Sequence, residues 1–256
     1  MSRSATIASP SRLTRGDGAT IAYHRTEGKS PGVVFMGGFM SDMSGIKATT
    51  LEAHCRATGR AYLRFDYFGH GESSGRFEDG TIGRWQDDAL AVLDALTAGP
   101  QIVVGSSMGG WIALLAALAR PERVHALIGL AAAPDFTEDL LYAAFDAETR
   151  AALERDGRIE IPSDYGDAPY PITRRLIVDG RRHLLLGQAI GLRCPVRLFQ
   201  GMNDADVPWR HALRIMERIE GENAILTLIK DGDHRLSRPE DLARICAEID
   251  ALASGQ

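Results

Sequence analysis

Two stretches of the sequence place a serine in the pattern Gly-x-Ser-x-Gly, the spacing in which a serine hydroxyl can attack an acyl carbonyl. They are GESSG at 71–75 and GSSMG at 105–109, with Ser73 and Ser107 at their centres. A nucleophilic serine works best on a sharp turn from a strand into a helix, where the residues two before and two after it must be small. The surrounding sequence decides which stretch supplies such a turn.

The stretch around Ser107 has the required surroundings. QIVVG at 101–105 predicts a strand, and the apolar run MGGWIALLAALA that follows Ser107 predicts a helix. Ser106 is excluded because Val104, two residues before it, is not small. Ser73 leads into the polar, glycine-rich RFEDGTIG and is interpreted as a turn residue. The sequence therefore predicts Ser107 as the nucleophile.

A serine nucleophile needs a histidine base, which a carboxylate holds in the right tautomer. Of the seven histidines, His234 in DGDHR follows the last predicted strand and precedes a helix, so its loop can aim an imidazole across the strand ends. Asp204, in FQGMNDADVPW, is the expected acid, and Asp206 is its nearest competitor. The order Ser107, Asp204, His234 is the one that a serine on a strand-to-helix turn requires. Together they predict acyl transfer through an acyl-enzyme.

The other histidines have weaker support. His70, in FGHGESSG, is interpreted as a turn-stabilising residue or as a supporting residue of the site. His183 and His211 are further candidates to face the site, without a supporting pattern. Surface or structural roles are expected for the remainder, His24, His54 and His125.

The oxyanion of an acyl-transfer reaction needs two hydrogen-bond donors. Met108, directly after Ser107, is expected to supply one backbone N–H. Phe39, which follows Gly38 in FMGGFMSDMSG, is expected to supply the other. The alternative for this second stretch is a glycine-rich loop without a catalytic role.

Short apolar runs alternate with helical segments along the chain, which predicts the α/β class with a mostly parallel sheet and helices on both faces. RLTRGDGATIAYHR at 12–25 predicts an antiparallel hairpin at the sheet edge, the first two of eight strands. The other six are expected at 32–37, 61–66, 101–105, 125–132, 194–201 and 224–230. Helices are expected near 45–58, 81–98, 107–119, 209–220 and 239–252.

Residues 134–193 interrupt this alternation after the sixth strand. They hold helical stretches at 137–157 and around 181–190, separated by a piece rich in proline and tyrosine. An insertion of this length in a compact domain is typical of an active-site cover. We expect a small helical lid at 134–193 within a single domain spanning 1–256, and a disordered N-terminus over residues 1–10.

Composition narrows the classes of partner and compartment. The net charge of −5 comes without a basic stripe, which excludes a nucleic-acid binder. The three cysteines are odd in number and form no C-x-x-C pair, so neither a disulfide framework nor a metal site is expected, and a cytoplasmic location is predicted. The alternative is a mitochondrial location, because the acid-free opening MSRSATIASPSRLTRG loosely resembles a transit peptide. No membrane span is expected, and monomer and homodimer remain open.

The chain resembles the α/β-hydrolase fold, and within it the α/β-hydrolase domain-containing protein 10 group. The resemblance runs through GVVFMGGFMSDMSGIKA, RFDYFGHGESSG, TIGRWQDDALAVLDAL, GSSMGGW, CPVRLFQGMNDADVPW and DGDHR. It implies a cofactor-independent serine hydrolase that cleaves long-chain acyl thioesters, such as S-palmitoyl cysteine, and acyl-glucuronide esters. It also implies that Ser107, Asp204 and His234 match the triad, and that Phe39 and Met108 match the oxyanion donors.

Substrate contacts and rival functions complete the expectations. An acyl pocket is expected from Phe39, Leu140, Leu141, Phe145 and Leu185, and ordinary packing of the lid is the alternative for the leucines and Phe145. The expected substrate is a small or protein-linked acyl ester or thioester. The rival functions are a short-chain carboxylesterase and, from another class, a non-catalytic small-molecule receptor on the same fold.

Overall fold

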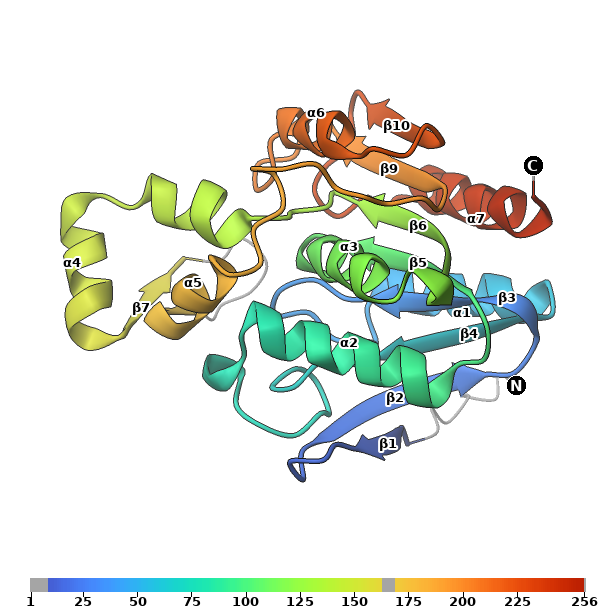
Figure 1. Ribbon diagram of the computed structural model, residues 1–256, viewed down its shortest axis with the longest axis horizontal. Helices are drawn as coiled ribbons and strands as arrows, with labels where there is room; N and C mark the ends of the chain where they lie inside the picture. The colour runs from blue at the N-terminus through green and yellow to red at the C-terminus, as the bar shows by residue number, and fades with distance from the viewer. Residues whose placement is uncertain (1–8, 163–168, 256) are drawn as a thin grey trace, which may run out of the picture.

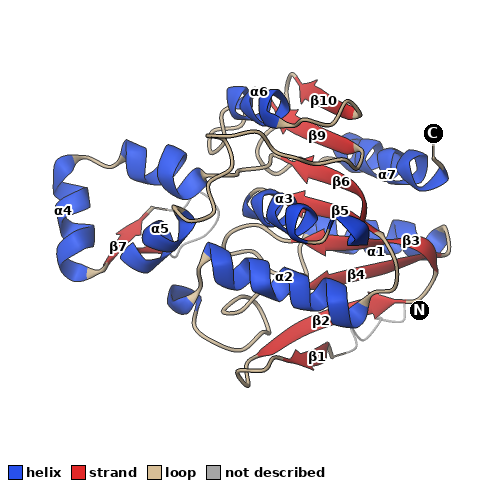
Figure 2. Cartoon of the chain, in the orientation of Figure 1, coloured by secondary structure: helices blue, strands red, loops and turns tan. Residues whose placement is uncertain are grey.

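The computed structural model describes residues 9–162 and 169–255. The disorder expected for residues 1–10 therefore falls almost wholly outside the described residues. Over the described part, the chain forms one large sheet covered by helices on both faces, with a small group of elements projecting beyond the sheet (Figures 1 and 2).

The central sheet has eight strands in the order β1-β2-β4-β3-β5-β6-β9-β10. The pairs β1·β2 and β2·β4 are antiparallel, and all other neighbouring pairs are parallel. The predicted α/β fold with an antiparallel edge hairpin is confirmed. The strands are β1 (Ser11–Thr14), β2 (Thr20–Thr26), β3 (Lys29–Met36), β4 (Arg60–Phe65), β5 (Gln101–Ser106), β6 (Val124–Leu130), β9 (Val196–Gly201) and β10 (Ala224–Ile229).

Two apolar cores lie on the two faces of the sheet, because successive side chains of a strand point to opposite sides. In β5, Val103 joins one core, whereas Ile102 and Val104 join the other. The first core is closed by α2 (Ile82–Leu96), α3 (Met108–Ala119) and α6 (Trp209–Arg218). The second is closed by α1 (Ile46–Ala57) and α7 (Pro239–Ser254) (Figure 1). Single 3-10 turns, η1 (Phe77–Asp79) and η2 (Pro121–Arg123), complete the body.

The chain between β6 and β9 leaves the sheet and forms the projecting group seen beside it in Figure 1. Its elements are η3 (Thr137–Leu141), η4 (Tyr142–Ala144), α4 (Ala147–Asp156), β7 (Arg158–Ile161), β8 (Tyr170–Thr173) and α5 (Arg174–Gly180). The insertion is helical in part, as expected, and it also contains the antiparallel strand pair β7–β8, which the sequence analysis did not predict. Ile172 of this pair packs with Leu153 of α4 in a small separate core.

The prediction of a helix around 181–190 is wrong, because these residues form turns and irregular structure. The helix lies earlier, at α5, where the Thr173 hydroxyl accepts a hydrogen bond from the backbone N–H of Leu176 and caps the first turn. The leucine run that suggested a helix is instead held in irregular structure by Asp135. Its carboxylate accepts the N–H groups of Leu185 and Leu186, both at 2.8 Å.

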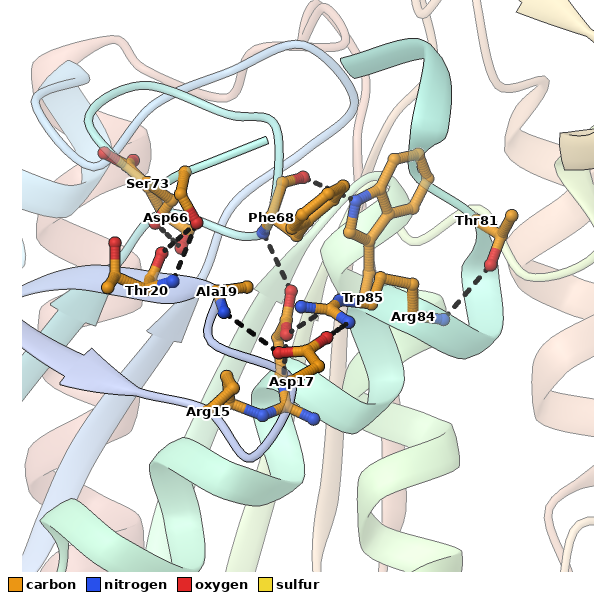
Figure 3. A network of polar contacts seen from close by, with 12 residues as sticks. Arg15, Asp17, Ala19, Thr20, Asp66, Phe68, Ser73, Thr81, Arg84 and Trp85 are labelled. Carbon is orange, nitrogen blue, oxygen red and sulfur yellow. Dashed lines mark hydrogen bonds and ion pairs between the residues drawn. The ribbon is translucent and has the colours of Figure 1, made fainter. Parts of the chain in front are cut away.

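The GESSG stretch fastens the loop after β4 to β2, the strand between the edge strand β1 and β4. Ser73 Oγ accepts the N–H of Ala22 at 2.8 Å and donates to the carbonyl oxygen of Asp66 at 2.6 Å. Ser74 Oγ accepts the N–H of Thr20 at 2.7 Å. Figure 3 shows Ser73 beside Asp66 and Thr20, next to the ion pair of Asp17 with Arg84. Ser73 and Ser74 therefore have a structural role, since their hydroxyl groups connect the loop after β4 to β2.

Replacing Ser73 with alanine is expected to lower the free energy of unfolding by about 1 to 3 kcal/mol, because the buried N–H of Ala22 loses its acceptor. Acyl hydrolysis per folded molecule should not change. Denaturant unfolding and steady-state kinetics on the same preparation measure both quantities. A large fall in kcat at full folding would return GESSG to the list of candidate nucleophile motifs.

Candidate active site

Ser107 lies on the turn between β5 and α3, as the sequence predicts. Its backbone has φ 55° and ψ −120°, a left-handed conformation that a non-glycine residue adopts only under strain. The neighbouring glycines make the turn possible. A Cβ atom on Gly109 would collide with the carbonyl oxygens of Met36 and Gly37, and one on Gly105 with that of Gly109. The turn thus brings the start of α3 against the end of β3.

His234 and Asp204 reach Ser107 from the loops after β10 and β9. His234 Nε2 lies 3.0 Å from Ser107 Oγ, and His234 Nδ1 lies 2.8 Å from Asp204 Oδ2. The side chain of His234 is 15% exposed and that of Asp204 is fully buried. Because β9 and β10 are parallel neighbours on the same side of β6, their two loops open at the same edge of the sheet. The three predicted residues are in contact; their catalytic roles remain a prediction.

The choice between Asp204 and Asp206 follows from the contacts of each carboxylate. Asp204 Oδ1 accepts the backbone N–H groups of Asp206 and Val207, at 2.9 and 2.8 Å. Its Oδ2 accepts from His234 and from Gln200 Nε2. Asp206 is exposed and lines the cavity described below. The carboxylate that meets His234 is thus that of Asp204.

Asp204, Asp206 and His234 place one ligand atom each within 4.8 Å of one another, close enough to hold a metal ion. Both oxygens of Asp204 already accept two hydrogen bonds each, however. The arrangement therefore suits a hydrogen-bonded carboxylate and imidazole better than a pair of metal ligands.

The two expected oxyanion donors lie beside Ser107. Met108 is the first residue of α3, where a backbone N–H has no acceptor inside the helix. A Cβ atom on Gly38 would lie 3.4 Å from Ser107 Cβ and 4.0 Å from its Oγ, so the Gly38–Phe39 segment passes directly over the serine. The assignment of the Phe39 and Met108 N–H groups to the oxyanion stays a prediction.

A cavity of about 600 Å³ opens above the three residues. Ser107, His234 and Gly38 line it, and the insertion supplies much of the apolar lining. From the insertion come Phe136, Leu140, Leu141, Ile161, Tyr170 and Ile172, and Phe39 adds a further ring from the loop after β3. Three of the five residues expected to contact substrate, namely Phe39, Leu140 and Leu141, thus line the cavity.

The other two expected substrate contacts lie elsewhere. Leu185 is buried in the main core, where its N–H is bound by Asp135. Phe145 packs against the small core of the insertion and against the ring of Tyr142, with the ring centroids 6.2 Å apart. Both side chains follow the alternative interpretation, packing of the insertion, and neither lines the cavity.

The ring of Phe39 joins the insertion to the body of the molecule. It contacts Phe77 and Trp85 of the body at centroid distances of 4.8 and 6.0 Å. It also contacts Phe136 and Tyr170, at the start and within the insertion, at 5.6 and 5.7 Å. The sequence contains no signal for this contact set, because its members are far apart along the chain.

Lys47 is a cavity residue that the sequence analysis missed. Its Nζ donates to the carbonyl oxygen of Arg235 at 2.5 Å, directly beside His234. Burial lowers the pKa of Lys47 to about 8. The residue ties α1 to the loop that carries the histidine.

The remaining candidate histidines make contacts away from Ser107. His211 Nε2 lies 2.7 Å from the carbonyl oxygen of Pro134, and His183 Nε2 lies 3.6 Å from Asp179 Oδ2. His70 is buried among the rings of Tyr67, Phe77 and Trp85, with Nδ1 3.2 Å from the carbonyl oxygen of Phe68. Of its two expected roles, the geometry favours stabilisation of the turn.

His70 should make stability depend on pH. Burial lowers its pKa from 6.5 to about 4, so the folded protein keeps the ring neutral while the unfolded chain protonates it. The stability that depends on neutral His70 is present above pH 6.5 and is lost as the pH falls toward 4, by roughly 3 kcal/mol in all. His70→Phe should lack this loss. Urea unfolding of both proteins at several pH values tests it, and parallel pH curves would contradict it.

Among the described residues, no helix is both long and apolar enough to span a membrane.

Comparisons with known proteins agree with the geometry. Residues 33–156 match the alpha/beta hydrolase fold family. The chain is 43% identical to a mouse protein named "Palmitoyl-protein thioesterase ABHD10, mitochondrial" over 246 residues. This alignment covers 96% of the present chain and 82% of the relative.

Two solved structures have the same fold over nearly their whole length. The α/β-hydrolase domain-containing protein 10 from mouse superposes with a TM-score of 0.90 at 42% identity, covering 97% of this chain and 99% of that one. A putative hydrolase from Agrobacterium vitis S4 superposes with a TM-score of 0.92 at 40% identity, covering 95% and 98%.

The predicted cytoplasmic location is contradicted, since the mouse, bovine and human relatives are named as mitochondrial proteins. The prediction rested on three cysteines, which the structure shows as free thiols. Free thiols are typical of reducing compartments in general and do not distinguish one such compartment from another. The fold, the strand-to-helix turn at Ser107 and the extent of identity together show that the chain belongs to the α/β-hydrolase family, in the group of α/β-hydrolase domain-containing protein 10.

Proposed function

We propose that this protein hydrolyses acyl thioesters through an acyl-enzyme on Ser107, with long acyl chains as its preferred substrates. The observation that carries the proposal is the hydrogen-bonded sequence Asp204–His234–Ser107, which opens into a cavity with a largely apolar wall. The names of the relatives, palmitoyl-protein thioesterases, supply the substrate class.

In the first half-reaction, His234 Nε2 takes the proton of Ser107 as its Oγ attacks the acyl carbonyl carbon. The oxyanion is stabilised by the N–H groups of Met108 and Phe39. The tetrahedral intermediate then expels the thiolate, which receives the proton from the imidazolium. Asp204 stabilises that imidazolium through Nδ1.

In the second half-reaction, a water molecule gives a proton to His234 and its oxygen attacks the acyl carbon. The intermediate collapses, Ser107 Oγ departs and takes the proton back, and the free acid is released. The acyl chain would lie along the apolar wall formed by Phe39, Leu140 and Leu141. In this proposal, residues 134–193 form a lid whose side chains exclude water from the intermediate.

The proposal is tested with a matched series of thioesters and oxygen esters carrying C2 to C16 acyl chains, using the wild type and Ser107→Ala. Thioester kcat/KM that rises with chain length and disappears in the variant is the expected result. If only short oxygen esters react, the protein is a short-chain carboxylesterase. If acyl compounds bind without turnover, the protein is a receptor on this fold.

A further inference from the structure

Gln200, the penultimate residue of β9, is fully buried and touches the carboxylate of Asp204. Its Nε2 donates to Asp204 Oδ2 at 2.8 Å. The second hydrogen of this NH₂ group is shared between the carbonyl oxygens of Val207 and Gly201, which lie 3.1 and 3.2 Å from the nitrogen. One side-chain amide thus binds both ends of the loop that carries Asp204, together with Asp204 itself.

The orientation of this amide is set by its surroundings. All three groups around the nitrogen are acceptors, and only the NH₂ end of a glutamine side chain can donate to them. The other end, Oε1, is buried and has no hydrogen-bond partner among the described residues. Leaving Oε1 buried without a partner costs free energy, so a glutamine at this position is explained only if the hydrogen bonds of its Nε2 are needed.

The role of these hydrogen bonds follows from the oxygen to which Gln200 donates, Asp204 Oδ2. Asp204 Oδ2 is also the oxygen that accepts from His234 Nδ1. The backbone N–H groups of Asp206 and Val207 hold Oδ1, the opposite oxygen. Without the Gln200 donor, the position of Oδ2 would depend on His234 alone, the group that it has to orient.

We infer that Gln200 is a positioning residue that fixes the carboxylate of Asp204 for its interaction with His234. The inference rests on the proposed function, because it assigns Asp204 the role of orienting the base. Its effect should appear in the transition state, where His234 becomes positively charged, and much less in the binding of substrate.

The test is Gln200→Met, which keeps the length of the side chain and removes the donor. Gln101→Met is the matched control. Gln101 is also buried, and its Nε2 donates to the carbonyl oxygens of Ala98, Gly99 and Pro100, but it lies at the opposite end of β5 from Ser107. Both variants lose a buried amide with three acceptors, and only one of them is next to Asp204.

Gln200→Met is expected to lower kcat by about 10- to 100-fold with KM nearly unchanged, the kinetic equivalent of one hydrogen bond to a charged group. Gln101→Met should keep the wild-type kcat and KM, whatever its stability. Active sites are counted by the burst of the first turnover, so that a difference in folded fraction does not count as a difference in kcat.

Gln200→Glu is a second variant for the case that the methionine disturbs the fold. It keeps the shape of the side chain, and its carboxyl group can donate to Asp204 only while it is protonated. Its kcat should therefore fall below that of the wild type as the pH rises and the new carboxyl ionises, because two carboxylates then face each other. Equal kcat for Gln200→Met, Gln200→Glu and the wild type would overturn the inference while leaving the proposed function intact. If Ser107→Ala keeps the activity of the wild type, the proposed function fails, and the role of Gln200 fails with it.

Discussion

Replacing Ser107 with alanine is expected to lower kcat for acyl hydrolysis by roughly five to six powers of ten, because the nucleophile and base act as a unit. The loss should not come from unfolding, since the hydroxyl makes its described contact with His234 at the surface of the cavity. Steady-state kinetics with enzyme purified away from contaminating hydrolases measure the rate. A variant that retains a tenth of the activity would show that Ser107 is not the nucleophile.

Ser107→Gly separates chemistry from backbone strain. It should be as inactive as the alanine variant, but more stable than it by about 1 to 2 kcal/mol, because glycine adopts the left-handed φ of 55° without steric cost. Denaturant unfolding of the two variants side by side gives this difference. A glycine variant no more stable than the alanine variant would indicate that the turn stores no strain.

Gly109→Ala is expected to be among the most destabilising single substitutions in the chain, with a loss above about 4 kcal/mol. The added methyl group would overlap the backbone oxygens of Met36 and Gly37, which cannot move without distorting β3. The protein should therefore unfold at much lower denaturant concentration. Any folded fraction should be inactive, because Gly38 and Phe39, the expected oxyanion segment, directly follow the displaced Met36 and Gly37 in the chain.

Gly187→Ala is the control for that experiment. A Cβ atom there meets nothing within 4 Å, and the residue has no positive φ. This variant should match the wild type or gain up to about 1 kcal/mol by restricting the unfolded chain. Similar unfolding midpoints for the two alanine variants would contradict the close packing described at the turn.

The parts of the fold that were predicted from the sequence are those with local signals. The strand at 101–105, the small residues around Ser107 and the apolar helix after it are contiguous, so one stretch of chain defines the turn. The order of the three site residues adds a constraint that few other folds meet. The contact of Asp204 with His234 then follows from the neighbouring positions of β9 and β10.

The parts that were missed depend on contacts between distant segments. The strands β7 and β8 are four residues each and gain their stability from pairing and from Leu153, which no local period reveals. The run Leu184–Leu186 has helical composition, yet Asp135, about fifty residues earlier, binds its backbone in another conformation. Gln200 in VRLFQG looked like the end of a strand, and only the folded loop shows what its amide meets.

The separate origin of the cavity walls has a consequence for how such an enzyme changes over time. The loops after β5, β9 and β10 carry the reacting groups, whereas the segment between β6 and β9 supplies much of the apolar lining. That segment joins the sheet at only two points, so its length and sequence can vary while the spacing of Ser107, His234 and Asp204 is preserved. Natural selection can thus alter which acyl group is accepted without changing Ser107, Asp204 and His234. A protein designer can do the same by exchanging one insertion for another.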